Sequence, residues 1–112
     1  MKKDDSIYVE HILDSANTIL KYMHGKSETD FLKDGMLQDA VVRQIEIIGE
    51  ATKNISMEFR NEHDEVPWKR MAGMRDIIIH EYFNVNLEVI YDTATKWIPE
   101  LKAQIERILN AK

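Results

Sequence analysis

The chain has 112 residues, of which 31% are charged, and its formal net charge at pH 7 is −5. This length suits one domain with a small core, so we expect a single domain over residues 1–112. The absence of cysteine excludes disulfides and thiolate metal sites, and it is compatible with a cytoplasmic location. The acidic charge counts against binding nucleic acid by bulk attraction, although Lys69, Arg70 and Arg75 could form a local basic cleft.

The first predicted helix opens at Asp4–Ser6, because Asp and Ser are good helix-capping residues. Its apolar residues recur at spacings of three and four, as in an amphipathic helix: Val9, Ile12, Leu13, Ala16, Ile19, Leu20 and Met23. We expect it to end near His24–Gly25, where the glycine can cap it. A short second helix is predicted to begin at Ser27–Asp30 and to end before Asp34–Gly35.

A second long helix is predicted from about Met36 to Phe59. Its inner stripe consists of Leu37, Val41, Ile45, Ile48, Thr52, Ile55 and Phe59. Val42, Ile47 and Ala51 widen the apolar surface, which indicates contact with more than one neighbour or with a second chain. Gly49 costs the helix about 1 kcal/mol relative to alanine, so it reflects either close helix packing or a tolerated small residue.

The third long helix is expected from about Trp68 to Phe83, because Pro67 suits a helix start. Asn84–Asn86 should break it. The last helical region has one apolar stripe, formed by Leu87, Ile90, Ala94, Trp97, Leu101, Ile105 and Ile108. Pro99 should kink or divide this region and push Ile98 away from helical angles. With no strand signal, the predicted fold is all-α, an up-and-down four-helix bundle with an additional short helix.

The segment Met71–Phe83 carries Arg75, His80 and Tyr82 within eight residues, set among isoleucines and a phenylalanine. The arginine guanidinium has a fork of donors that suits a phosphate. The histidine can take and return a proton at neutral pH, because its ordinary pKa is about 6.5. Apolar surroundings strengthen such charge interactions.

Each of these residues also has a structural interpretation. Arg75 could form a salt bridge to Glu81 or Asp76, and Asp76 could orient either Arg75 or His80. His80 could favour the end of a helix, where the dipole stabilises its cation. Tyr82 could pack with its hydroxyl at the rim. The remaining histidines lack metal-ligand spacing, so no metal site is expected.

Helical geometry separates the two candidate catalytic residues. At about 100° per residue, Tyr82 lies roughly 20° from Arg75, whereas His80 lies roughly 140° from it. An undistorted helix therefore does not aim Arg75 and His80 at one point. The helix could loosen near His80, the arginine could reach around it, or a second subunit could complete the site.

Three segments, taken in order, resemble one known family. They are Arg43–Ala51, Val66–Met74 and the pattern Arg75-x4-His80-x-Tyr82. Together they resemble HEPN domains of the HepT toxin type, and the resemblance runs from about Asp4 to Leu109. It implies the toxin of a type VII toxin–antitoxin pair, a metal-independent endoribonuclease that needs no cofactor.

The resemblance also implies roles and partners. Arg75 and His80 would be catalytic on RNA, with Asp76 in support, and a partner nucleotidyltransferase would inactivate the toxin by transferring AMP to Tyr82. We expect a homodimer, or a multiple of one, with the two motif helices facing each other. The apolar runs are too short for a membrane span, so no membrane association is expected. The alternative is a non-catalytic module that docks the nucleotidyltransferase through the Leu37–Phe59 helix and holds a nucleotide or phosphate.

Overall fold

The structure is a computed structural model that describes residues 2–81 and 84–111, apart from the side chain of Lys3. These residues form helices only, in the order α1 (Lys3–Met23), α2 (Glu28–Lys33), α3 (Gly35–Lys53), α4 (Met57–Glu62), α5 (Trp68–His80), α6 (Leu87–Asp92), the π-helical turn η2 (Thr93–Trp97) and α7 (Ile98–Asn110). The predicted all-α class is confirmed. No helix in the described ranges is both long enough and apolar enough to cross a membrane.

The first two helix boundaries follow their capping residues. Gly25 has a φ of 73°, a left-handed conformation that glycine adopts without strain, and the chain turns there after α1. Ser27 and Asp30 form a reciprocal capping box at the start of α2. The Asp34 side chain accepts a hydrogen bond from the Leu37 amide at 3.0 Å and so caps α3.

The helix predicted over 36–59 is wrong in its length, because the structure ends α3 at Lys53 and starts a separate helix α4 at Met57. The Ser56 side chain caps α4 by accepting a hydrogen bond from the Phe59 amide. Asp5 of α1 is buried and accepts hydrogen bonds from the Ser56 amide and hydroxyl, each at 2.8 Å. A short helix therefore lies on each side of α3 in the chain, α2 before it and α4 after it, where only the first was predicted.

Pro99 divides the C-terminal helical region, as predicted, but through a different distortion. The turn η2 widens to π-helical geometry immediately before α7, and Pro99 lies in the first turn of α7. Ile98 keeps helical angles, with φ −65° and ψ −43°, so the expected displacement of Ile98 is wrong. A widened turn accommodates the missing proline N–H without interrupting the continuous helical segment formed by α6, η2 and α7.

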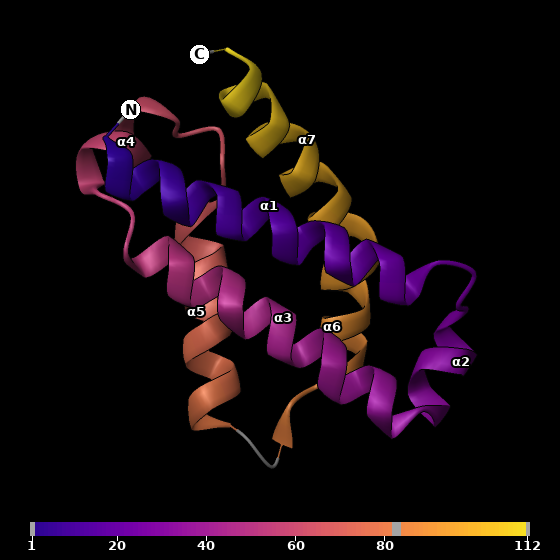
Figure 1. Cartoon of the computed structure of the whole chain (residues 1–112). Coiled ribbons are helices and arrows are strands. Elements are labelled where there is room, and N and C mark those ends of the chain that lie inside the picture. The colour runs from indigo at the N-terminus through magenta and orange to yellow at the C-terminus, as the bar shows by residue number, and fades with distance from the viewer. Residues whose placement is uncertain (1, 82–83, 112) are drawn as a thin grey trace.

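Helix α3 lies at the centre of the molecule, packed against α1 on one side and α5 on another, and α7 packs against α1 (Figure 1). Every residue of the predicted inner stripe is buried, including Ile55 and Phe59, which lie beyond the end of α3. The additional apolar residues are also used within the chain: Ala51 is buried, and Val42 packs against the core. Contact of this helix with more than one neighbour is therefore confirmed, whereas contact of its partly buried Ile47 with a second chain stays a prediction.

Candidate active site

Helices α3 and α5 approach most closely where Gly49 faces Arg75. A Cβ built on Gly49 would overlap the Cβ of Arg75 and would lie 2.7 Å from the carbonyl oxygen of Met71. Both neighbouring atoms belong to the backbone or adjoin it, so neither can move away cheaply. Close helix packing thus explains this glycine, and the missing side chain lets the two helices hold Arg75 between them.

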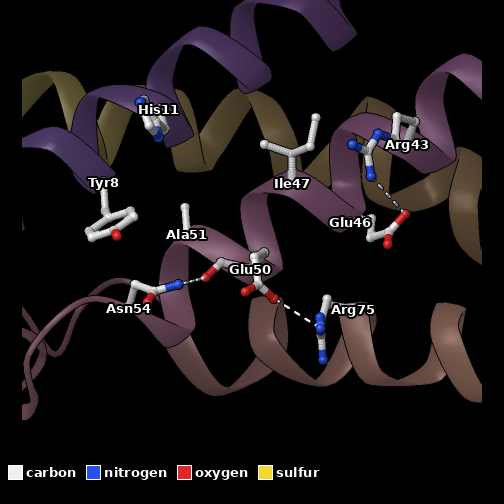
Figure 2. Close-up of a pocket in the computed structure, with 9 residues that line it drawn as sticks. All are labelled: Tyr8, His11, Arg43, Glu46, Ile47, Glu50, Ala51, Asn54 and Arg75. Atoms are coloured by element: carbon white, nitrogen blue, oxygen red, sulfur yellow. Dashed lines mark hydrogen bonds and ion pairs between the residues drawn. The ribbon is translucent and has the colours of Figure 1, made fainter.

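Two carboxylates hold the Arg75 guanidinium. Its Nη2 lies 3.0 Å from Oε2 of Glu50 on α3, and its Nη1 lies 3.3 Å from Oδ1 of the neighbouring Asp76. Figure 2 shows the Arg75 side chain directed from α5 toward Glu50. The same Asp76 oxygen accepts a hydrogen bond from Nζ of Lys53 at 2.6 Å. The side chains therefore alternate in charge in the order Glu50, Arg75, Asp76, Lys53, and these contacts fix the Arg75 side chain in one orientation.

Within one chain, the Asp76 carboxylate contacts Lys53 and Arg75. The hydrogen bond from Lys53, together with a weaker one from Arg75, holds the pKa of Asp76 below its ordinary value of 3.8. Asp76 therefore stays ionised at neutral pH. The salt-bridge alternative for Arg75 is confirmed for Asp76, and Glu50 takes the place proposed for Glu81.

His80 is the last residue of α5, and its side chain is exposed. The helix stays α-helical up to His80, and Arg75 is directed toward α3, so neither a loosened helix nor a reaching arginine joins the two residues. Five helical residues turn His80 roughly 140° away from Arg75. Completion of the site by a second subunit stays a prediction.

The proposed modification residue Tyr82 lies outside the described residues. Its predicted position beside Arg75 assumed a helix that continues to Phe83, but α5 ends at His80, and Glu81 follows with φ −113° and ψ 35°. The helical-wheel argument therefore no longer supports a shared face for Arg75 and Tyr82. The family resemblance is the remaining support for that assignment.

Helices α5 and α6 carry exposed apolar side chains. Ile77 is 54% exposed and Ile79 is 40% exposed, and Val89 of α6 is 44% exposed. Ile77 and Val89 line an apolar pocket of about 150 Å³ between α5 and α6. Helix α5 thus exposes apolar side chains at Ile77 and at Ile79, the immediate neighbour of the candidate catalytic histidine, although Met36 of α3 and Met57 of α4 are more exposed.

A pocket of about 270 Å³ opens beside Arg75 and contains residues that the sequence analysis missed. Nine side chains line it: Tyr8 and His11 of α1; Arg43, Glu46, Ile47, Glu50 and Ala51 of α3; Asn54; and Arg75 of α5 (Figure 2). In the sequence, the one indication that Tyr8 and His11 act together is their spacing of three residues, which places both side chains on one face of α1. Among the described residues, no group of three or more His, Asp or Glu side chains is placed to hold a metal ion.

Comparison with known proteins gives a consistent assignment. A family model described as "Ribonuclease HepT-like" matches residues 12–108. The "Putative RNase TTE0752" of Caldanaerobacter subterraneus subsp. tengcongensis is 52% identical over 102 residues, covering 91% of each chain. The "Probable ribonuclease HepT" of Thermococcus cleftensis is 42% identical over 108 residues, covering 96% of this chain and 98% of the relative.

One relative is a longer protein. The "Gamma-glutamylcyclotransferase and putative RNase MJ0434" of Methanocaldococcus jannaschii is 50% identical over 109 residues, but the match covers 97% of this chain and only 49% of that protein. None of the solved structures matches the chain significantly. The family model spans most of the residues, including α5 with its arginine and histidine, and the helical fold agrees with it. The chain therefore belongs to the HepT-like ribonuclease family, a group of HEPN domains.

Proposed function

We propose that this chain is the endoribonuclease toxin of a toxin–antitoxin pair, and that it cleaves RNA without a metal ion. The observation that carries the proposal is the HepT-like ribonuclease match over residues 12–108, which includes Arg75 and His80. The fixed, half-buried position of Arg75 supports it, because a phosphate ligand needs a guanidinium that is already oriented.

The reaction would use the substrate's own nucleophile. The 2′-oxygen of a ribose attacks the adjacent phosphorus, a P–O2′ bond forms and the P–O5′ bond breaks, which leaves a 2′,3′-cyclic phosphate. His80 removes the proton from the 2′-hydroxyl, and an imidazolium returns a proton to the departing 5′-oxygen. Arg75 stabilises the negative charge that builds on the phosphoryl oxygens.

The active unit would be a homodimer with the two α5 helices facing each other. The exposed side chains of Ile77 and Ile79 flank His80 and give this surface its apolar character. Two-fold pairing would bring the Arg75 of each subunit toward the His80 of the other, which the geometry of one helix does not allow. It would also concentrate positive charge in one groove of an acidic protein.

Regulation would act on the same motif. We propose that a partner nucleotidyltransferase transfers one or more AMP groups from ATP to the Tyr82 hydroxyl, with release of pyrophosphate. Each AMP adds about one negative charge and a base close in sequence to His80, and so it would compete with the RNA backbone. Intact-mass analysis after incubation with partner and ATP should show AMP additions that are absent from Tyr82→Phe. Additions that persist in Tyr82→Phe would place the modification elsewhere.

The ribonuclease assignment is tested by incubating RNA with purified protein in EDTA. We expect cleavage with 2′,3′-cyclic phosphate ends, lost in Arg75→Ala and in His80→Ala and kept in the surface control His24→Ala. Arg75→Ala and His80→Ala should keep the circular dichroism spectrum of the parent, because neither substitution opens a large core cavity. Intact RNA across varied substrates, or an unfolded variant, would overturn the catalytic assignment.

A second candidate function is a non-catalytic module that binds a nucleotidyltransferase and holds a nucleotide or phosphate. The observation that favours it is that both terminal nitrogens of Arg75 already contact carboxylates, while His80 lies apart from them in one chain. Expression of the chain alone separates the two functions. Growth arrest that depends on His80 supports the toxin, whereas a harmless chain that co-purifies with its partner supports the module.

A further inference from the structure

The pocket beside Arg75 has a composition that suits one class of ligand. Arg43 and Arg75 balance Glu46 and Glu50, so the walls offer donors and acceptors without an excess of either charge. Ile47 and Ala51 add apolar surface, and Tyr8 adds an aromatic ring. A phosphate would favour an excess of cations, and an apolar ligand would not need four charged groups.

The Tyr8 ring is half-buried and is held in place by its neighbour. His11, one helical turn farther along α1, contacts it edge to face, with ring centroids 5.9 Å apart and planes at 89°. Proteins that bind single-stranded RNA commonly stack bases on tyrosine or histidine rings and bond the exposed base edges. The volume of about 270 Å³ is near the lower limit for ligand pockets, which suits one base rather than a longer segment.

The pocket also presents unused hydrogen-bond acceptors. Glu46 contacts Arg43 through Oε1 at 3.5 Å, and Glu50 contacts Arg75 through Oε2 at 3.0 Å. The second carboxylate oxygen of each glutamate receives no hydrogen bond from the described residues. Asn54 donates its amide to the Glu50 carbonyl oxygen at 2.9 Å, which leaves its own side-chain oxygen as a third acceptor.

We propose that this pocket binds a base of the RNA strand next to the scissile phosphate and that it favours guanine over uracil. Guanine presents an exocyclic amino group and an adjacent ring N–H, two donors that match a carboxylate. Uracil offers only one ring N–H on the same edge. Because Arg75 forms one wall, a base held here would place its own phosphate beside the guanidinium. This inference rests on the proposed ribonuclease function and assigns its base specificity.

The test measures binding apart from cleavage. Fluorescence anisotropy with 2′-O-methyl trinucleotides, which cannot form a cyclic phosphate, compares guanine-containing with uracil-containing strands. We expect tighter binding of the guanine strand, a loss of that preference in Glu46→Gln, and about tenfold weaker binding of both strands in Tyr8→Ala and His11→Ala. Glu106→Gln and His24→Ala, which change exposed residues outside the pocket, should bind as the parent does.

The outcomes separate this inference from the proposed function. RNA cleavage that proceeds with an unchanged base preference in Glu46→Gln and an unchanged KM in His11→Ala would overturn the base pocket and leave the ribonuclease intact. A preference for guanine that Glu46→Gln abolishes, in a protein that cleaves no RNA, would support the pocket and overturn the enzyme. His11→Ala keeps the test decisive if Tyr8→Ala fails to fold, because His11 is exposed.

Discussion

Replacing Gly49 with alanine adds one methyl group at the closest contact between α3 and α5. That methyl would overlap the Cβ of Arg75 and lie 2.7 Å from the Met71 carbonyl oxygen. Helix propensity alone predicts the opposite outcome, because alanine is favoured over glycine within a helix by about 1 kcal/mol. The sign of the change in stability therefore shows whether the steric overlap or the helix propensity is the larger effect.

The expected magnitude follows from these two effects. Overpacking a core by one methyl group costs about 1–3 kcal/mol, and the upper part of this range applies because the contacted atoms are a Cβ and a backbone oxygen. Subtracting the propensity gain leaves a net loss of about 2 kcal/mol. For a chain of this size that corresponds to a fall in Tm of roughly 8 °C. Displacement of Arg75 should also lower RNA cleavage.

Urea and thermal denaturation at one fixed protein concentration measure the effect, because the proposed dimerisation would make stability depend on concentration. Gly35→Ala is the matched control: it adds the same methyl group to the same helix at a position with nothing within 4 Å. We expect that control to stay within about 0.5 kcal/mol of the parent. A Gly49→Ala protein as stable as the parent, or more stable, would refute the close-packing argument.

Three other changes test separate parts of the structure. Asp5→Asn should cost about 2–3 kcal/mol in urea, because the buried carboxylate accepts two bonds from Ser56; a change below about 0.5 kcal/mol would contradict this. The lowered pKa of Asp76 means that its small stabilisation is present above pH 3.8 and is lost as pH falls through the folded-state pKa, so the stability gap between parent and Asp76→Asn should narrow below that pH. A pH-independent gap would show that the carboxylate's charge is not the cause. Ile77→Asp should convert the dimer to monomer in light scattering, whereas Met36→Asp, at a side chain that is 85% exposed, should not; a monomeric parent at micromolar concentration would contradict the dimer.

The sequence predicted those parts of the fold that depend on residues close to one another along the chain. The apolar stripe of α3 and the helix start at Ser27–Asp30 are local signals, and the structure confirms both. The break between α3 and α4 was missed although Ser56 is a capping residue. It depends on a contact between Asp5 and Ser56, residues 51 positions apart, and such pairings have no periodicity to detect.

The candidate site was predictable to a similar extent. Arg75 and His80 became candidates through their chemistry and the family resemblance, and the helix that carries both is present but ends at His80 rather than at Phe83. The partner Glu50 and the pocket residue His11 were missed, because they meet Arg75 only through the packing of α1, α3 and α5. Gly49 carried a detectable signal, since a glycine within a long helix needs a packing reason or is merely tolerated.

A mixture of two inactive variants tests the central claim most directly. If each active site takes Arg75 from one subunit and His80 from the other, a dimer of Arg75→Ala with His80→Ala keeps one intact site. We therefore expect no RNA cleavage in EDTA by either variant alone and recovered cleavage after their subunits exchange. An absence of recovery, with exchange verified by mass spectrometry and the parent protein active, would contradict a site shared between subunits.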